Sequence, residues 1–221
     1  MQTTLTLTKD GSHTLFVPNL GEHYHSIHGA IQESRHVFIN AGLRACTAKT
    51  LHILEVGFGT GLNALLTLIV CTKHRLHANY TAIEPFPLAE ETWKQLNYPQ
   101  LLANPLVGES FVSLHIAPYG EVVAINQRFS LYKTREGINT ATLQSERFDL
   151  IFFDAFGPTI QPELWTAEVF EKLYKTSAKN GILVTYAAKG LVRRNMTEAG
   201  YSVERLPGPP GKREMLRATK L

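Results

Sequence analysis

Cysteine is scarce in this chain of 221 residues, which contains only Cys46 and Cys71. The two residues lack the spacing of a metal-binding motif, and the N-terminal segment MQTTLTLTKDG lacks the basic and apolar regions of a secretory signal peptide. We therefore expect no disulfide and a reducing, cytoplasmic setting. No stretch approaches the roughly 20 consecutive apolar residues of a membrane span, so no membrane partner is expected.

Net charge is also small, at +3, but it is unevenly distributed. Residues 186–221 contain eight basic and three acidic residues, a net charge of +5, which leaves −2 for the rest of the chain. A basic C-terminal face could bind the phosphates of a nucleic acid or be a solvated surface, and charge alone leaves both readings open. The candidate phosphate contacts are Lys189, Arg193, Arg194, Lys212 and Arg213.

The chain is long enough to bury one substantial core, since 44% of its residues are hydrophobic. Strands are predicted to alternate with helices, and residues 97–128 to wrap irregularly before a helix. The predicted strands are 51–56, 78–83, 129–132, 150–153, 181–186, 201–206 and 214–219, and the predicted helices are 62–70, 88–96, 162–174 and 193–199. This alternation predicts an α/β fold with a doubly wound, mostly parallel, Rossmann-like sheet and a C-terminal antiparallel hairpin.

The first 45 residues differ from the rest. Alternation in Thr3–Thr8, a turn at Asp10-Gly11 and a return strand at Thr14–Val17 predict a hairpin. Three histidines follow, but their spacing does not place them on one helical face and no Cys or Asp joins them, so no metal site is predicted; they are His23, His25 and His28. We expect residues 1–45 to form an extension that packs on the active site of a main domain, residues 46–221.

The most informative stretch is LHILEVGFGTGLNALLTLIV, residues 51–70. It predicts a strand, a glycine turn and a helix, a geometry in which glycines accept positive φ and let a ligand approach the helix N-terminus. Its G-x-G-x-G spacing differs from the dinucleotide fingerprint, and Glu55 beside it disfavours a pyrophosphate. S-adenosyl-L-methionine (SAM) has an ammonium group and no phosphate, so the stretch favours SAM; a turn without a ligand is the alternative.

Two further acidic residues end predicted strands. Glu84 is placed to accept hydrogen bonds from ribose hydroxyls, which NAD and SAM both contain. Asp154 ends the apolar segment FDLIFF, where an aspartate can also serve as a helix cap or turn residue. Since ligands of open parallel sheets bind beyond the carboxyl ends of the strands, Glu55, Gly57, Glu84 and Asp154 are expected to converge.

Several segments carry a more specific signal. They are GEHYHSIHGAIQESRHVF, EVGFGTGLNAL, IEPFPL, FDAFGP followed by PELW, GLVRRNMTEAGYSVE and GPPGKREML. Together, from about Asp10 to Leu216, they resemble the methyltransferase domain of the MnmC-type tRNA-modifying enzymes. The resemblance implies the SAM-dependent methyltransferase fold and SAM-dependent N-methylation of the primary amine of 5-aminomethyl-2-thiouridine at the tRNA wobble position.

The resemblance also assigns roles to residues. Those implied to contact SAM are Glu55, Gly57, Phe58, Gly59, Gly61, Asn63, Glu84 and Asp154. We hypothesise that Asp154 accepts the N–H groups of the reacting amine and that Tyr24 and His25 close the pocket, which makes these three the catalytic candidates. Relatives usually have an acidic residue for the adenine after the fourth strand, where this chain has KTREG with Glu136.

One departure from the family concerns size. The bifunctional relatives carry an FAD-dependent oxidase domain that exposes the amine, and 221 residues leave no room for it. We therefore expect a stand-alone methyltransferase that acts on tRNA and depends on a separate enzyme for its aminomethyluridine substrate. The alternatives are a SAM-dependent methyltransferase of a small-molecule or protein amine, and a non-catalytic SAM- and RNA-binding module.

Overall fold

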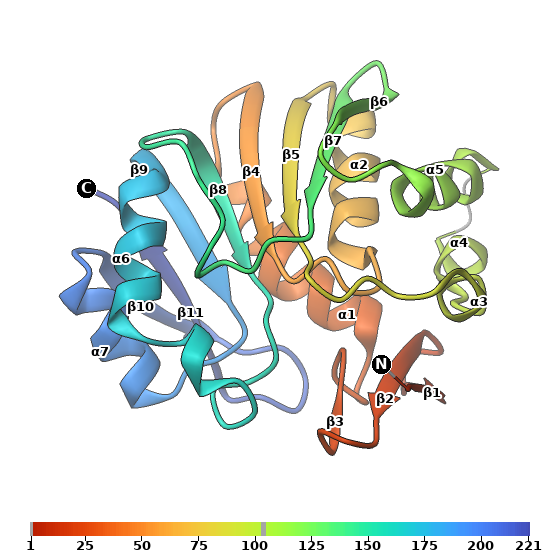
Figure 1. The fold of residues 1–221 in the computed structure, drawn as a ribbon, viewed down its shortest axis with the longest axis horizontal. Coiled ribbons are helices and arrows are strands. Elements are labelled where there is room, and N and C mark those ends of the chain that lie inside the picture. The colour runs from red at the N-terminus through yellow and green to blue at the C-terminus, as the bar shows by residue number, and fades with distance from the viewer. Residues whose placement is uncertain (1, 103–104) are drawn as a thin grey trace.

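An eight-stranded sheet in the order β10-β11-β9-β8-β4-β5-β7-β6 forms the centre of the molecule (Figure 1). The computed structural model describes residues 2–102 and 105–221. The parallel strands are β4 (Thr50–Val56), β5 (His77–Ile83), β7 (Phe129–Thr134), β8 (Phe148–Phe153) and β9 (Ser177–Thr185). Antiparallel strands flank them: β6 (Val122–Asn126) at one edge, and the hairpin of β10 (Ser202–Pro207) and β11 (Glu214–Thr219) at the other. The predicted fold is confirmed.

Helices cover both faces of this sheet (Figure 1). One face is packed by α1 (Ala30–Ser34), the π-helical turn Arg35–Asn40, the 3₁₀ turn Leu43–Ala45, α2 (Leu62–His74) and α5 (Pro105–Ile116). The other is packed by α6 (Ala167–Thr176) and α7 (Gly190–Glu198). Strands covered on both faces are apolar along their length, and the side chains of Leu150–Phe153 are accordingly 0% exposed. Within the described residues, no helix has the length and apolar character needed to cross a membrane.

Three predicted segments differ from the structure. The helix predicted at 88–96 shrinks to α3 (Glu90–Trp93), and α4 (Tyr98–Leu101) begins separately beside Pro99. The helix predicted from Pro162 begins at Ala167, where the side chain of Thr166 caps it after a 3₁₀ turn at Pro162–Leu164. Residues 97–128 were predicted to wrap irregularly before a helix. They contain the helices α4 and α5 and, unexpectedly, the edge strand β6, while residues 103–104 lie outside the described part.

The N-terminal residues form a second, three-stranded antiparallel sheet of β1 (Thr4–Leu7), β2 (His13–Val17) and β3 (Glu22–His23). The predicted hairpin is thus confirmed. This sheet lies beyond the ends of the central strands, next to the start of α1 (Figure 1). From Ala30 onward the chain packs into the main core, through residues such as Val37 and Phe38. The boundary at residues 45 and 46 stays a prediction.

Asp10 connects this small sheet to α1. The N-cap residue of α1 is Gly29, which has no side chain to accept a hydrogen bond. Asp10 Oδ2 accepts one from the backbone N–H of Gln32 (2.9 Å), and Ser12 Oγ accepts one from that of Ala30 (3.1 Å). Burial raises the pKa of Asp10, but hydrogen bonds from Ser12, Gln32 and Thr8 outweigh it and hold that pKa below its ordinary value. The hairpin turn therefore caps α1, which carries Glu33 toward the site described below.

Replacing Asp10 by alanine should destabilise the fold. The variant loses an acceptor for a helix N–H and for Ser12, so its free energy of unfolding should fall by about 1–2 kcal/mol. Because folding lowers the pKa of Asp10, this contribution should be present above pH 3.8 and lost as the pH falls below it. Urea titration measures both effects. Glu90→Ala, which removes an exposed ion pair with Lys94, is the control; an equal loss in both variants would contradict the capping role.

Candidate functional site

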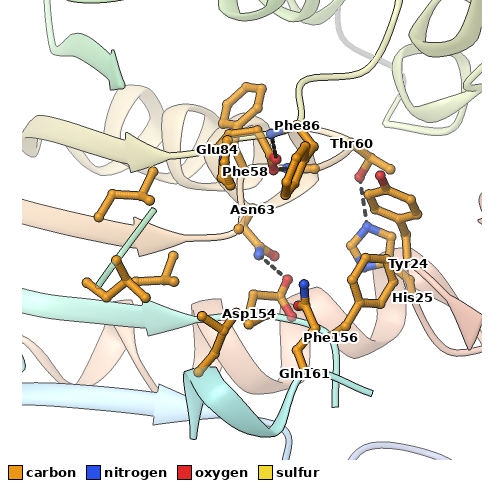
Figure 2. Close-up of a pocket in the computed structure, with 18 of the residues that line it drawn as sticks. Tyr24, His25, Phe58, Thr60, Asn63, Glu84, Phe86, Asp154, Phe156 and Gln161 are labelled. Atoms are coloured by element: carbon orange, nitrogen blue, oxygen red, sulfur yellow. Dashed lines mark hydrogen bonds between the residues drawn. The ribbon is translucent and has the colours of Figure 1, made fainter. Parts of the chain in front are cut away.

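A cavity opens at the carboxyl ends of β4, β5 and β8, beneath the N-terminal sheet (Figure 2). Its wall includes the glycine turn, Glu84 after β5, Asp154 after β8, and Tyr24 and His25 from the extension. The strand ends are held together by backbone hydrogen bonds, from Asp154 N–H to Val56 O (2.9 Å) and from Gly57 N–H to Ile83 O (3.0 Å). The structure thus brings Gly57, Glu84 and Asp154 to one edge of the sheet, as predicted.

The glycine turn exposes backbone to this cavity at Gly57 and Gly59 and is tightly packed against its neighbours. Gly57, Gly59 and Gly61 have φ values of 92°, 48° and 72°, a region that favours glycine. A Cβ atom on Gly57 would lie 2.5 Å from the carbonyl oxygen of Asp154. The turn ends at Leu62, where α2 begins and directs its N-terminus toward the site. A ligand can therefore approach the backbone closely.

Asn63 joins two carboxyl groups at the centre of the site. Its Nδ2 donates hydrogen bonds to Glu55 Oε1 (3.0 Å) and to Asp154 Oδ2 (2.8 Å; Figure 2). Burial and then the negative charge of Asp154 raise the pKa of Glu55 well above its ordinary value. Burial and then the charge of Glu33 raise the pKa of Asp154 to about 7, against the opposing effect of Asn63. Two carboxyl groups enclosed so closely favour a cationic ligand.

The predicted cofactor contacts fall into two groups. Those that line the cavity are Gly57, Phe58, Gly59, Asn63, Glu84 and Asp154. Glu55 and Gly61 lie behind its wall, and Glu55, fully buried with its Oε2 unpaired within the described residues, acts on the cavity through Asn63. The ring of Phe58 packs below the turn, 5.4 Å from Lys133 Nζ, so it supports the turn rather than filling the cavity.

Glu84 is fixed against the cavity wall by two backbone donors. The N–H of Gly59 donates to its Oε2 (2.8 Å) and the N–H of Phe86 to its Oε1 (2.9 Å), the second of which Figure 2 shows. Burial raises the pKa of Glu84, and these two hydrogen bonds oppose the rise. The carboxyl group retains lone pairs that can accept hydrogen bonds from the hydroxyls of a ligand.

Tyr24 and His25 close the cavity from the side of the extension (Figure 2). His25 Nε2 forms a 2.7 Å hydrogen bond with Thr60 Oγ1 in the glycine turn. Burial lowers the pKa of His25 to about 4, so the imidazole is neutral at pH 7. Tyr24 packs edge-on to Phe156 with ring centroids 5.1 Å apart, and burial followed by the charge of Glu84 raises its pKa. Both side chains therefore enclose the cavity without ionising.

Of the other polar residues considered in the sequence, His23 also lines this cavity, whereas Glu136 and His28 do not. Glu136 is exposed and does not line the cavity, whereas Gly137 and Ile138 of the same segment do. His23 packs on Phe16, and His28 contacts the backbone at Gly211. In the part of the chain that the structure describes, no group of three or more His, Cys, Asp or Glu side chains could hold a metal ion.

A second cavity of about 720 Å³ adjoins the first and shares Tyr24, His25 and Tyr186 with it. Three of the five predicted phosphate contacts line it: Lys189, Lys212 and Arg213. The other two, Arg193 and Arg194, are exposed on α7. Glu33, which also lines this cavity, was not predicted from the sequence, because a glutamate in a short amphipathic helix resembles a surface residue. Its partner Lys212 lies at the other end of the chain.

Comparisons with known proteins agree with this arrangement. The family described as "S-adenosyl-L-methionine-dependent methyltransferase" matches residues 121–221. The tRNA 5-methylaminomethyl-2-thiouridine biosynthesis bifunctional protein MnmC of Pseudomonas paraeruginosa is 30% identical over 90% of this chain, which covers 32% of that protein. The corresponding protein of an Azoarcus species is 32% identical over 98% of this chain, which covers 35% of it. The chain thus spans about a third of the length of these relatives.

Comparison with solved structures also finds a similar MnmC protein. The crystal structure of MnmC2 from Aquifex aeolicus has a TM-score of 0.75 and 26% identity, and the match covers 98% of this chain and 70% of that one. Spermidine synthase from Thermotoga maritima, at 13% identity and a TM-score of 0.57 over 100% of this chain and 72% of that one, shares the fold. The features of this site fit SAM. The glycine turn lets a ligand approach the backbone, the enclosed carboxyl groups suit the ammonium group of SAM, and Glu84 suits its ribose hydroxyls.

Replacing Gly57 by alanine should weaken SAM binding by about tenfold or more, because the new Cβ atom strains the turn by about 1–3 kcal/mol and displaces the Asp154 carbonyl. Equilibrium dialysis with labelled SAM measures this. The matched control is Gly108→Ala in α5, where a Cβ atom meets nothing within 4 Å and should stabilise the helix slightly without changing affinity. Unchanged affinity in Gly57→Ala would exclude this turn as the SAM cradle.

Proposed function

We propose that this chain, which is similar to the methyltransferase portion of the MnmC-type proteins, methylates the aminomethyl group of wobble 5-aminomethyl-2-thiouridine in tRNA with SAM as the methyl donor. The names of its relatives indicate this product, because they refer to the biosynthesis of 5-methylaminomethyl-2-thiouridine in tRNA. The observation that carries the proposal is the junction of two cavities. The first has the features of a SAM site and has Asp154 in its wall. The second is lined by three basic side chains, Lys189, Lys212 and Arg213, together with three acidic ones, Glu22, Glu33 and Glu214.

Residues of the first cavity would hold SAM. The backbone of Gly57 and Gly59 faces the cofactor, Glu84 accepts hydrogen bonds from its ribose hydroxyls, and the carboxyl pair held by Asn63 attracts its ammonium group. When bound, SAM supplies an electrophilic methyl group on a sulfonium. Tyr24 and His25 exclude water from this part of the cavity.

The acceptor amine must lose a proton before it reacts. An alkylammonium has a pKa of about 10, taking lysine as the reference, so freeing its lone pair at pH 7 costs about 4 kcal/mol. That cost is a modest part of a methyl-transfer barrier, and no strong base is required. The protein has to hold the amine in line with the methyl group. Asp154, partly exposed to the cavity, can accept an N–H of the amine and fix its direction.

The basic residues are suited to tRNA phosphates. Lys189, Lys212 and Arg213 surround the second cavity, and Arg193 and Arg194 extend the positive surface along α7. Each phosphate contact of this kind contributes to salt-dependent binding. Because tRNA is modified in the cytoplasm, we expect the protein there. A reaction that exposes or installs the primary amine has to precede this methylation.

Two other functions are possible for such a site. A methyltransferase of a small-molecule or protein amine would use the first cavity in the same way, but its activity would not fall steeply with salt. A non-catalytic SAM- and RNA-binding module would bind both ligands without turnover. The carboxyl groups of Glu55, Glu84 and Asp154 are all present in this chain, and this favours a catalytic site over a binding module without turnover.

The direct test is transfer of a labelled methyl group from SAM to tRNA from cells that lack the wobble methylation. We expect label in tRNA, and mass spectrometry of the digested nucleosides should identify 5-methylaminomethyl-2-thiouridine. Rates should decline steeply as salt rises, since phosphate contacts are screened. Label in small amines but not in tRNA would favour the first alternative, and SAM binding without any transfer would favour the second.

The pH dependence should depend on Asp154. Burial raises the pKa of this carboxyl group to about 7, so the fraction of Asp154 present as the ionised carboxylate, which accepts the hydrogen bond, increases as the pH rises through that value. The free amine also grows tenfold per pH unit up to about pH 10. With both substrates far below KM, the logarithm of the rate should rise with a slope near 2 below pH 7 and near 1 above it.

Asp154→Asn is the matched variant for this profile. It keeps the shape of the side chain but removes the titrating group, so its profile should have a slope near 1 throughout and a lower rate. A break near pH 7 that persists in Asp154→Asn would assign the titration to another group. Wild-type turnover by this variant would remove Asp154 from the mechanism.

A further inference from the structure

Lys212 occupies a small ammonium-binding site in the wall of the second cavity. Its Nζ lies 2.5 Å from Glu33 Oε1 and 3.8 Å from the ring centroid of Tyr186. A carboxylate and an aromatic face are the two groups that proteins combine to bind alkylammonium ions. The acceptor proposed above is also a primary alkylammonium, so the same site has the chemistry to bind it.

Two of the three side chains of this site are held in place independently of Lys212. The side chain of Glu33 is 6% exposed, and its Oε2 accepts a hydrogen bond from the backbone N–H of Ser26 (2.7 Å). The hydroxyl of Tyr186 donates to the carbonyl oxygen of Ala155 (2.9 Å), the residue after Asp154. The site would therefore persist if the lysine left.

Lys212 itself is held less firmly. Its side chain is 33% exposed, and the residue lies on the loop between β10 and β11, next to the exposed Arg213. The loop borders the second cavity, where phosphates would arrive. A lysine in this position can exchange a carboxylate for a phosphate by rotating its flexible side chain.

The ammonium site is also close to the reacting groups. Tyr186 lines both cavities, so it forms part of their shared wall. Glu33 raises the pKa of Asp154 and Lys212 lowers it, which places both charges within electrostatic reach of that carboxyl group. Tyr186 also connects the ammonium site to the chain at Asp154, because its hydroxyl donates to the carbonyl oxygen of the next residue, Ala155.

We propose that Glu33 and the ring face of Tyr186 form the binding site of the acceptor ammonium, which Lys212 occupies until the acceptor displaces it and the lysine moves to an RNA phosphate. This inference rests on the proposed function, because it takes the acceptor to be the aminomethyl group of a tRNA nucleoside. Glu33 binds the charged form of the acceptor. The bound ammonium loses one proton to solvent in the second cavity, and the lone pair that this frees takes the methyl group of SAM as S-adenosylhomocysteine leaves. Asp154 accepts a hydrogen bond from a remaining N–H of that nitrogen.

The exchange predicts opposite effects for two acceptors. The free nucleoside 5-aminomethyl-2-thiouridine has no phosphate, so it must displace Lys212 without giving the lysine a new partner. Removal of the lysine charge should therefore help the nucleoside, since the site no longer has a competing occupant. Transfer RNA gains the same advantage but loses a phosphate contact.

Lys212→Met tests this directly. The variant should lower KM for the free nucleoside about fivefold, because the site is open in every molecule, and it should raise KM for tRNA. Calorimetric titration of the nucleoside into the complex with S-adenosylhomocysteine should show the same gain in affinity. Glu33→Gln, which keeps the shape of the side chain, should raise KM about tenfold for both acceptors because it removes the charged partner of the ammonium.

Lys220→Met is the matched control. Lys220 also pairs with a carboxylate, Glu146 (3.4 Å), and lies over a tyrosine ring, Tyr174 (4.9 Å). Lys220 follows β11 and lies beside β9, where its backbone forms hydrogen bonds with Asn180 and Gly181. It lines neither cavity. Neither KM should change in this variant.

Other outcomes separate the two proposals. If the wild-type protein methylates tRNA but Lys212→Met leaves the nucleoside affinity unchanged or weakens it, Lys212 has a structural role and the inference is wrong. If neither protein binds the nucleoside, the site is not an acceptor site. If Lys212→Met does not fold, Lys212→Arg replaces it: a guanidinium pairs more firmly with Glu33, so nucleoside KM should rise, and an unchanged value would overturn the exchange. Absence of any wild-type product refutes the proposed function itself.

Discussion

Enclosed negative charge is the constraint on which the rest of this site depends. Glu55 and Asp154 end two neighbouring parallel strands, and only the amide of Asn63 lies between their carboxyl groups. Such a pair is costly to ionise inside a protein, so the pKa values of both carboxyl groups are raised, and a nearby cation would favour their ionised forms. The glycine turn lines the same cavity, which has room for that cation's carrier. Stability is thus given up locally in favour of cofactor binding.

The N-terminal extension completes what the sheet begins. Its residues reach the glycine turn through the hydrogen bond between His25 and Thr60, and they reach the C-terminal hairpin through Glu33 and Lys212. Asp10 holds this arrangement by capping the helix that carries Glu33. The first and second cavities therefore share one wall, and a substitution in the extension would alter the lining of both.

Local patterns in the sequence were sufficient for much of the fold and for part of the site. The glycine turn, Glu84 and Asp154 each end a buried strand, and parallel strands bring such ends together. Strand β6 was missed because Val122–Asn126 is short and lies half-exposed at an edge, where alternation is weak. Glu33 and Tyr186 were missed for another reason: their roles arise from contacts between distant segments. The burial of Glu55 behind the cavity wall is likewise a tertiary effect that spacing does not encode.

The ion pair between Glu33 and Lys212 joins residues 179 positions apart, which affects when each part of the site can form. Contacts of such high sequence separation form late, because closing a long loop costs entropy. A chain emerging from the ribosome presents the glycine turn, Glu84 and Asp154 well before the C-terminal hairpin. Most of the wall of the first cavity is therefore synthesised before the loop between β10 and β11, which completes the wall of the second cavity. The second cavity can form only when synthesis has reached the last strands.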